Sequence, residues 1–583
     1  MDMICSPLSN QRVDLAQTLL PNICLADNNA SDNKQIDVLI GANYYWNFVT
    51  GQIIKTENAL TTVQTILGWT LNGNVRVSSF TVNVAHVLLS HGGHELSTDN
   101  LKKFWQVEDI NEVDTTFNIG KFSEKIDFDG ERYSVPLPWK QDHEQIPDNF
   151  QNSRNRLTSV FRRLKAEPEL LQQYDDIIKQ QKRDGIIEQL TEPPPPPGKV
   201  HYLPHHYILK EDKSTNKVRI VYDASSNSPS LNDCLEKGPS LLPLLMDILI
   251  RFGTYKVAVA SDIKQAFLNV AINTPDRDFL RFLWFDDITK ENPQLMIYRY
   301  TRVIFGMNAS QFLLAASIIK HLEKYQSADP DFVLAFLENL YVDDSIGGGD
   351  TSDQVFTFYQ KAKARLKEAG LILRSNSPTL QAQISKFEIK DPAPPDEKIL
   401  GITWDTANDE MEIDLSRQKQ LAQSDVLLTK RNILKIIASI YDPVGLVSPL
   451  VVPFKVFFQK LCTTVNDWDT EVSEELKDEW NSLIQLFSIS SKYRLPRYYF
   501  ANYPLSDLKN ITLHGFCDAS KRSYAAVVYI IGTLSSGRSI GRIVCSKTKV
   551  SPLNELSIPR LELLSCLKKK LDFQKRESRF AVE

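Results

Sequence analysis

The chain has 583 residues, of which 42% are hydrophobic and 24% are charged, and its formal net charge is −5. This composition is ordinary for a globular protein, and the length exceeds what one hydrophobic core supports, so we expect roughly three to five domains. No run approaches the roughly 20 apolar residues of a membrane span, and the N-terminus lacks the layout of a signal peptide. The seven cysteines form no C-x-x-C pair, which disfavours a zinc ribbon or a disulfide framework and indicates an intracellular chain.

The charge balance says little about partners. A net negative charge is unusual for a nucleic-acid-binding domain, but charge in a chain with several domains is local. Basic residues gather in two stretches, residues 154–165 and 568–579. Each stretch can be the solvated face of a helix or a contact for phosphates, and the sequence leaves both interpretations open.

The first 200 residues change character several times. Residues 1–80 predict short strands and turns, because their apolar runs are brief and end at turn residues. Residues 81–150 predict a polar connector with amphipathic pieces. From 150 to 190 the apolar residues recur three and four positions apart, which predicts helices. The five consecutive prolines at 193–197 predict a stiff polyproline spacer, with a ligand for a proline-reading domain as the alternative.

Strand and helix patterns alternate between residues 200 and 405. Two strand patterns around residues 214–216 predict a hairpin, and the run at 255–263 predicts a buried strand that ends in a carboxylate. Residues 336–349 predict a strand that enters a tight, glycine-rich turn. Residues 355–370 predict a helix that ends at a glycine.

The C-terminal part has a different pattern. Residues 430–465 predict helices interrupted at prolines. The segments after residue 510 predict paired strands that open another domain. No internal repeat is evident along the chain.

Three aspartates stand where apolar runs end. Asp343 and Asp344 follow a largely apolar run at 332–340 and precede a glycine-rich segment at 345–349 that permits a sharp reversal. Asp262 closes a second apolar run. Carboxylates on rigid strand ends can bridge two Mg²⁺ ions roughly 3.5–4 Å apart, as phosphoryl transfer by the two-metal route requires. An adjacent aspartate pair also occurs in turns and helix caps, which is the alternative.

The motifs around these aspartates resemble a known family. Tyr341-Val342-Asp343-Asp344, together with an upstream Asp-x-x-x-Ala-Phe segment that begins at Asp262, is similar to the reverse transcriptase palm of retroelements. The wider resemblance is to polyproteins of the BEL/Pao class of long-terminal-repeat retrotransposons, and it extends over nearly the whole chain. The segments that carry it are residues 129–140, 203–252, 257–272, 302–314, 341–344, 400–406 and 440–461.

The resemblance implies a multidomain α+β fold, a right-hand polymerase with palm, fingers and thumb. It implies a β-rich C-terminal remnant of a retropepsin-like aspartic protease before the polymerase and an incomplete ribonuclease H-like α/β domain after it. The implied boundaries are the protease remnant at 1–80, the connector at 81–150, fingers and palm at 151–390, thumb and connection at 391–505, and the ribonuclease H-like domain at 506–583.

The resemblance also implies roles for the residues around the aspartates. Asp262 and Asp343 would bridge two Mg²⁺ ions, for which Mn²⁺ could substitute, and Asp344 would be the third acidic member. Phe267 matches an aromatic position that crowds the sugar 2′-position and favours deoxynucleotides. A core phenylalanine is the plain alternative for Phe267.

Further nucleotide contacts follow from the same resemblance. Arg219, and with it Lys210, match basic residues that hold the incoming triphosphate, whereas an exposed strand arginine is the alternative. Phe305 and Gly306 match a segment that lies against the nascent base pair. Residues 400–406 resemble a hairpin that grips the primer backbone.

Two positions depart from the family pattern. Gln311 follows Ser310 where members have Ser-Pro, and Arg374 is followed directly by Ser375 where members carry an intervening Lys-Trp pair. The second departure resembles a small deletion beside the palm, and it leaves every expected metal ligand intact.

The two ends resemble incomplete domains. Residues 37–46 match the last part of the aspartic protease, but its catalytic Asp-[Ser/Thr]-Gly triplet does not occur in this region, so we expect no proteolytic activity. Asp518 and Glu562 match the first and second carboxylates of ribonuclease H, and the remaining ones should lie beyond Glu583. We therefore expect no cleavage of RNA–DNA hybrids.

Together these features predict an RNA-directed DNA polymerase that extends a primer on an RNA or DNA template with deoxynucleoside triphosphates. The expected location is the cytoplasm, in a virus-like particle of the parent element, with no membrane partner, and the sequence specifies no oligomeric state. Two alternatives stay open. One is a catalytically inert relic that at most binds nucleic acid, and the other is a nuclease that acts through Asp518 and Glu562.

Overall fold

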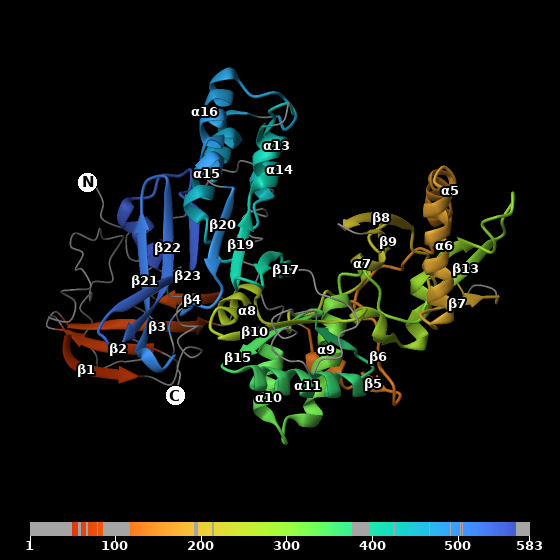
Figure 1. Cartoon of the computed structure of the whole chain (residues 1–583), viewed down its shortest axis with the longest axis horizontal. Helices are drawn as coiled ribbons and strands as arrows, with labels where there is room; N and C mark the ends of the chain where they lie inside the picture. Colours follow the sequence, from red (N-terminus) through yellow and green to blue (C-terminus); the bar gives the residue numbers. More distant parts are fainter. Residues whose placement is uncertain are drawn as a thin grey trace. The chain divides into compact units, whose positions relative to one another are not determined.

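The computed structural model describes residues 49–55, 60–65, 68–77, 80–84, 117–191, 196, 198–212, 215–375, 396–423, 426–465, 467–489, 491–501, 503 and 505–566. The chain divides into two compact units, Met1–Glu112 and Val113–Glu583. The described strands of the first unit form one antiparallel sheet in the order β1-β2-β3-β4 (Figure 1). Their bounds are β1 Val49–Lys55, β2 Leu60–Thr65, β3 Gly68–Val77 and β4 Phe80–Val84. Short strands are as predicted for this region, and the protease-like segment at 37–46 lies outside the described residues.

In the second unit, α5 (Phe150–Lys165) and α6 (Pro168–Arg183) confirm the helices predicted between 150 and 190. Their apolar faces cover an antiparallel sheet in the order β12-β13-β7. Tyr174 of α6 stacks on Trp284 of β12 with ring centroids 4.7 Å apart. The strand bounds are β7 Ile187–Leu190, β12 Arg281–Phe285 and β13 Leu295–Tyr300.

Residues 117–149 belong to the core of the second unit, which corrects the predicted connector over 81–150 for this part. They form α4 (Ile119–Ser123), β5 (Asp127–Phe128) and β6 (Tyr133–Val135), and β6 pairs in parallel with β11 (Ala271–Ile272). Phe122, Val135 and Leu137 are buried in the large apolar cluster around α5, α6 and α9 (Ser310–Leu322). The apolar residues of this segment sit in elements too short to show a period, so its sequence pattern is that of a connector.

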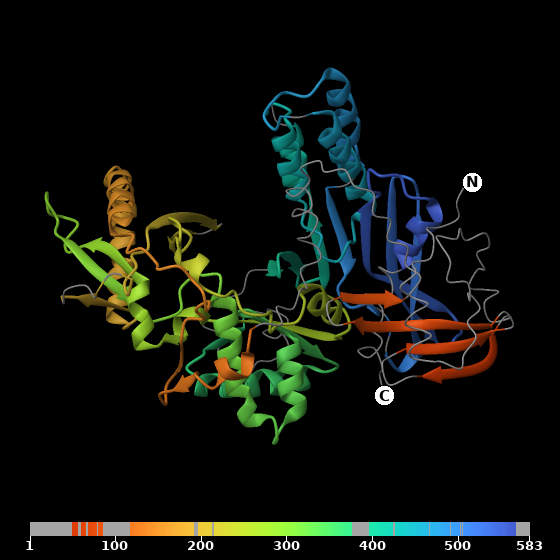
Figure 2. The same ribbon diagram turned by 180° about the vertical axis from the view of Figure 1, so that it is seen from behind.

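A four-stranded antiparallel sheet in the order β14-β15-β10-β16 carries the three aspartates. Successive residues of β10 face opposite sides, since Val259 packs against Val355 of α11 whereas Ala258 and Ala260 lie in a cluster with Ile248 of α8. Figures 1 and 2 show these two helices on opposite sides of the sheet. Because both faces are covered, residues 257–260 of the strand are all apolar, as predicted for a buried strand that ends in a carboxylate. The bounds are β10 Val257–Ile263, β14 Leu340–Tyr341, β15 Asp344–Gly349, β16 Leu373–Ser375, α8 Leu245–Phe252 and α11 Ser352–Glu368.

The run at 332–340 corrects a second expectation, because most of it is helical. The helix α10 (Pro330–Glu338) has a proline in its first turn and buries Phe332 and Phe336, which lie one turn apart. A short apolar run fits a strand or a helix equally well, and here the proline marks a helix start. The expected glycine-rich turn is also wrong, because the glycines at 347–349 belong to β15.

Other predicted elements are confirmed. The hairpin around residues 214–216 consists of β8 (His205–Asp212) and β9 (Thr215–Tyr222). The helix at 355–370 is α11 followed by Gly370, whose φ of 72° suits a glycine after a helix end. A further antiparallel sheet has the order β17-β18-β19-β20, with bounds β17 Asp396–Ile399, β18 Ile402–Asp405, β19 Glu410–Asp414 and β20 Lys492–Pro496.

The C-terminal part consists of helices followed by a three-stranded antiparallel sheet, and its sequence pattern predicted both helices and paired strands. Helices α14 (Lys430–Ala438), α15 (Ser448–Thr464) and α16 (Glu474–Ile484) share one apolar cluster. The strands β21 (Leu508–Ala519), β22 (Ser523–Leu534) and β23 (Ser539–Val550) then form an antiparallel sheet, and a helix follows at 558–566. Among the helices described in the chain, none combines the length and apolar character that crossing a membrane requires.

The close approach of β15 to β10 depends on Gly348. A Cβ atom at Gly348 would come within 2.4 Å of the Val257 carbonyl oxygen, whereas one at Gly347 would stay 3.8 Å from the Phe358 ring. We expect Gly348→Ala to lower the free energy of unfolding by about 2 kcal/mol and Gly347→Ala to change it by less than about 0.5 kcal/mol. Denaturant unfolding of both variants measures this difference, and equal stability of the two would contradict the described contact between the strands.

Candidate active site

Antiparallel pairing brings two of the predicted aspartates face to face. Asp262 of β10 is the cross-strand partner of Asp344 of β15. Residues that oppose each other in an antiparallel pair project from the same face, with Cβ atoms about 4.5–5.5 Å apart. The two aspartates therefore continue the row in which Ala258 and Ala260 lie, at the end of the strand pair.

Asp343 is held in the turn that joins β14 to β15. The Ile263 amide donates a hydrogen bond to the Asp343 carbonyl oxygen over 2.8 Å, which ties this turn to β10 immediately after Asp262. Val342 has φ of 57°, a conformation in which a β-branched side chain is strained. Backbone strain of this kind is characteristic of functional sites, and here it presents two consecutive aspartates beside Asp262.

Burial and like charge act together on these carboxyl groups. Burial raises the pKa of Asp343, and the neighbouring charge of Asp262 raises it further. Burial, followed by the charges of Asp343 and Asp262, raises the pKa of Asp344 to about 6. The three groups are therefore close enough to repel one another when ionised, and a nearby cation would relieve that repulsion.

One cation already contacts this group. Arg374 is the β16 residue opposite Asp262, and its Nη2 donates to Asp262 Oδ2 over 2.6 Å. Arg374 is also the residue beside which the family's Lys-Trp pair is missing, so this departure lies directly across the sheet from the candidate site. No local sequence pattern links Arg374 to Asp262, because the contact joins residues 112 positions apart.

The donor set suits Mg²⁺ or Mn²⁺, since hard divalent cations prefer carboxylate oxygens. Within the described ranges, however, no three His, Cys, Asp or Glu residues are grouped closely enough to hold a metal. Asp262, Asp343 and Asp344 would therefore have to converge by side-chain rotation for an ion to be bound.

Three of the predicted nucleotide contacts also come together. Phe267 and Phe305 meet edge to face, with ring centroids 4.7 Å apart. Phe267 is a core residue at 6% exposure, whereas Phe305 is 53% exposed. Gly306 has φ of 106°, and a Cβ atom there would lie 2.2 Å from the Tyr222 carbonyl oxygen. This stretch therefore passes directly against the end of β9.

The predicted basic residues lie on the β8–β9 hairpin. Arg219 is exposed on β9, three positions before Tyr222. Lys210 is paired with Lys217 through the strand backbone, and its side chain lies outside the described residues. Ser310 has a structural contact, since its buried Oγ donates to the Ile304 carbonyl oxygen over 2.6 Å.

Tyr441, which was not among the predicted site residues, connects the predicted primer-grip hairpin to the segment that carries the aspartates. Leu400 and Gly401, both with positive φ, form the turn between β17 and β18. The Tyr441 hydroxyl donates to the Leu400 carbonyl oxygen over 2.6 Å. Burial raises the pKa of Tyr441, and nearby Tyr341 raises it further, so the two phenols are neighbours. Only the folded chain joins residues 341, 400 and 441, so no local signal could have identified Tyr441.

The segments that carry the second pair of predicted carboxylates also lie against each other. Asp518 is exposed on β21, and Glu562 lies on the helix at 558–566. The Ala519 amide donates to Glu562 Oε1 over 3.2 Å, and Ser565 Oγ donates to the Asp518 carbonyl oxygen over 3.3 Å. These bonds dock the helix against the strand at the position of Asp518.

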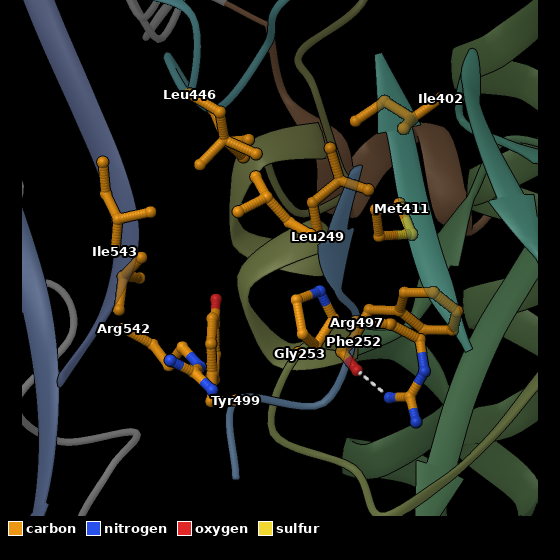
Figure 3. A pocket seen from close by; sticks show the side chains of 14 residues that line it. Leu249, Phe252, Gly253, Ile402, Met411, Leu446, Arg497, Tyr499, Arg542 and Ile543 are labelled. Carbon is orange, nitrogen blue, oxygen red and sulfur yellow. Dashed lines mark hydrogen bonds between the residues drawn. The ribbon is translucent and has the colours of Figure 1, made fainter. Parts of the chain in front are cut away.

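A separate apolar pocket of about 70 Å³ lies between α8, the β17–β20 sheet and β23 (Figure 3). Arg497 forms part of its wall and donates through Nη1 to the Phe252 carbonyl oxygen over 2.7 Å. The same guanidinium pairs with Asp409. No carboxylate is among the described residues that line the pocket, so it offers no ligand set for phosphoryl transfer.

The raised pKa of Asp344 predicts a pH-dependent loss of stability. The folded state keeps the Asp344 proton up to about pH 6, whereas an unfolded aspartate releases it near pH 4, so the folded state loses stability as the pH rises through this interval. Asp344→Asn keeps the neutral form and should raise the free energy of unfolding of the metal-free protein by about 1–2 kcal/mol at about pH 7.5 and by less at about pH 4.5. Unfolding in EDTA at both pH values tests this, and a gain that does not depend on pH would contradict it.

Two of the chains of known structure that are similar to this one are foamy viral proteins. One is the foamy viral protease-reverse transcriptase in complex with an RNA/DNA hybrid, at 13% identity and a TM-score of 0.45, covering 88% of this chain and 61% of that chain. The other is the foamy viral protease-reverse transcriptase dRH in complex with ds DNA, at 14% identity and a TM-score of 0.45, covering 91% and 85%. This chain thus spans less than two thirds of the first of these structures. No curated protein matches it in sequence.

A family model gives a more specific relationship. The model described as the Pao retrotransposon-like RNaseH-like domain matches residues 429–572. The matched span contains α14 to α16 as well as β21 to β23, and it includes Asp518 and Glu562. Helices that the sequence resemblance assigned to a thumb and connection therefore lie inside this family domain. This match confirms the resemblance to BEL/Pao-class retrotransposon polyproteins, and residues 429–572 are similar to the Pao retrotransposon-like RNaseH-like domain.

Proposed function

We propose that the chain is an RNA-directed DNA polymerase that adds deoxynucleotides to a primer 3′-end by two-metal nucleotidyl transfer. The observation that carries the proposal is the pairing of Asp262 with Asp344 across β10 and β15, with Asp343 in the adjoining turn. Strand pairing and a strained turn thus assemble an acidic centre from two segments far apart in the sequence. Two-metal phosphoryl transfer requires carboxylates from such segments, and here their side chains would converge by rotation when ions bind.

Asp262 and Asp343 would bridge two Mg²⁺ or Mn²⁺ ions, with Asp344 as the third acidic member. Ions bound there would activate the primer hydroxyl and neutralise the triphosphate and the leaving pyrophosphate. The protein's part is to hold the oxygen ligands on rigid strand ends. The raised pKa values of Asp343 and Asp344 support the assignment, because a divalent cation would relieve the repulsion that contributes to them.

The aromatic pair Phe267 and Phe305 would bound the nucleotide site. Phe267 would crowd the 2′-position of the incoming sugar from its buried place beneath the exposed Phe305. Gly306 would keep this segment against β9, where Arg219 projects. Arg219 and Lys210 would then offset the charge that the triphosphate brings.

In this proposal residues 151–390 form fingers and palm, residues 391–505 the thumb and connection, and residues 506–583 the end of the ribonuclease H-like region. Residues 1–80 would derive from an aspartic protease. The partners would be deoxynucleoside triphosphates and a primer annealed to RNA or DNA. Contacts would be mostly to phosphates, so binding should weaken steeply with salt.

Primer extension on a poly(rA) template with an oligo(dT) primer tests the proposal directly. The full chain should incorporate deoxythymidine triphosphate in the presence of Mg²⁺, and Asp343→Asn should reduce the rate by about a hundredfold or more because it removes a metal ligand. Asp353→Asn is the matched control, since it removes an exposed carboxylate on α11. It should leave the rate within about twofold.

Two results would contradict the polymerase assignment. One is the absence of incorporation by a chain that unfolds cooperatively and is therefore folded. The other is incorporation that is undiminished in Asp343→Asn, which would show that the activity comes from a contaminant or from another site.

A further inference from the structure

We propose that Arg374 competes with divalent metal for Asp262, so that its guanidinium fills the cation position at this carboxylate until an ion displaces it. This inference rests on the proposed function, because it concerns the same acidic centre. In this role Arg374 does not touch the substrate, and it affects how tightly the acidic centre binds metal by competing for Asp262.

Backbone pairing of the residues before and after Arg374 with β10 fixes the position of Arg374. Leu373 pairs with Ile263 and Ser375 pairs with Ser261, so Arg374 stands directly opposite Asp262. Ser375 Oγ also donates to the Ala260 carbonyl oxygen over 2.9 Å, which holds the end of this short strand. Because its backbone is held, the Arg374 guanidinium stays within reach of the carboxylate.

The contact occupies an oxygen that a metal would need. Arg374 Nη2 lies 2.6 Å from Asp262 Oδ2, the distance of a charge-assisted hydrogen bond. A guanidinium is a permanent cation in proteins, so loss of a proton does not release it from a carboxylate. An ion that takes Asp262 as a bridging ligand must therefore displace the guanidinium from this oxygen.

Displacement is possible because the pair is open to solvent. The Arg374 side chain is 50% exposed and the Asp262 side chain is 33% exposed, so the released guanidinium can be hydrated. Exposed ion pairs are weak, which makes Arg374 a competitor that a divalent cation can overcome. A buried pair of the same geometry would instead close the site to metal.

The charge balance around the site supports a compensating role. Asp262 faces Asp344 across the strand pair and Asp343 lies in the adjoining turn, so three negative charges are neighbours when all three groups are ionised. Within the described residues Arg374 supplies the ion pair to this group, and no ion pair joins Asp343 or Asp344 to a cation. The pair with Arg374 therefore partly replaces the metal charge while the site is without an ion.

Metal binding by the full chain tests the inference without any measurement of catalysis. Mn²⁺ is the probe, and electron paramagnetic resonance of free Mn²⁺ gives the dissociation constant. Arg374→Met removes the charge and keeps the aliphatic stem, and we expect it to bind Mn²⁺ roughly three- to tenfold more tightly than the wild type. Lys264→Met is the matched control, because Lys264 is exposed two residues from Asp262, and it should change the constant by less than about twofold.

A second readout separates this effect from a change in folding. Mn²⁺ should raise the unfolding temperature of Arg374→Met more than that of the wild type, since tighter binding stabilises the folded state more at a given concentration. Equal or weaker Mn²⁺ binding by Arg374→Met, with binding still lost in Asp343→Asn, would overturn the competition but leave the metal site in place. If Asp343→Asn binds Mn²⁺ as tightly as the wild type, the metal site of the proposed function fails together with the inference.

Discussion

The repulsion among three neighbouring carboxylates is the constraint on which the candidate site depends. Asp262 faces Asp344 because β10 and β15 pair in one register, and a slip of one residue would move Asp262 to the opposite face. The covering helices α8 and α11 hold that register, since the two faces of β10 have different apolar partners. The electrostatic strain is thus maintained by packing, and Arg374 relieves only part of it.

Much of this fold follows from local patterns in the sequence. The buried strand that ends at Asp262, the β8–β9 hairpin and the helix before Gly370 each carry a complete signal in a few consecutive residues. The three aspartates could be identified from the sequence because each stands at or near the end of an apolar run. What local patterns could not supply is the pairing of β10 with β15 and β16, which joins segments about a hundred residues apart.

Two predictions that the structure contradicts, for residues 332–340 and 117–149, failed for physical reasons. The run at 332–340 is apolar on nearly every side, so its period does not separate helix from strand, and the proline that starts α10 decides. The segment at 117–149 looks polar because its buried residues are few and scattered, yet Val135 and Leu137 are almost fully enclosed. Arg374 adjoins a departure from the family pattern and Tyr441 lies in the resembling segment 440–461, but the contacts of both residues exist only in the folded chain.

The most direct test of the central claim, that these carboxylates form a two-metal centre, is the anomalous X-ray signal of Mn²⁺ in crystals of the chain with a primer–template and a non-hydrolysable deoxynucleotide. We expect two peaks about 3.5–4 Å apart, each within about 2.0–2.4 Å of Asp262 or Asp343 oxygens. We also expect the Arg374 guanidinium to have left Asp262. Manganese peaks located only at other carboxylates, with Asp262 still paired to Arg374, would contradict it.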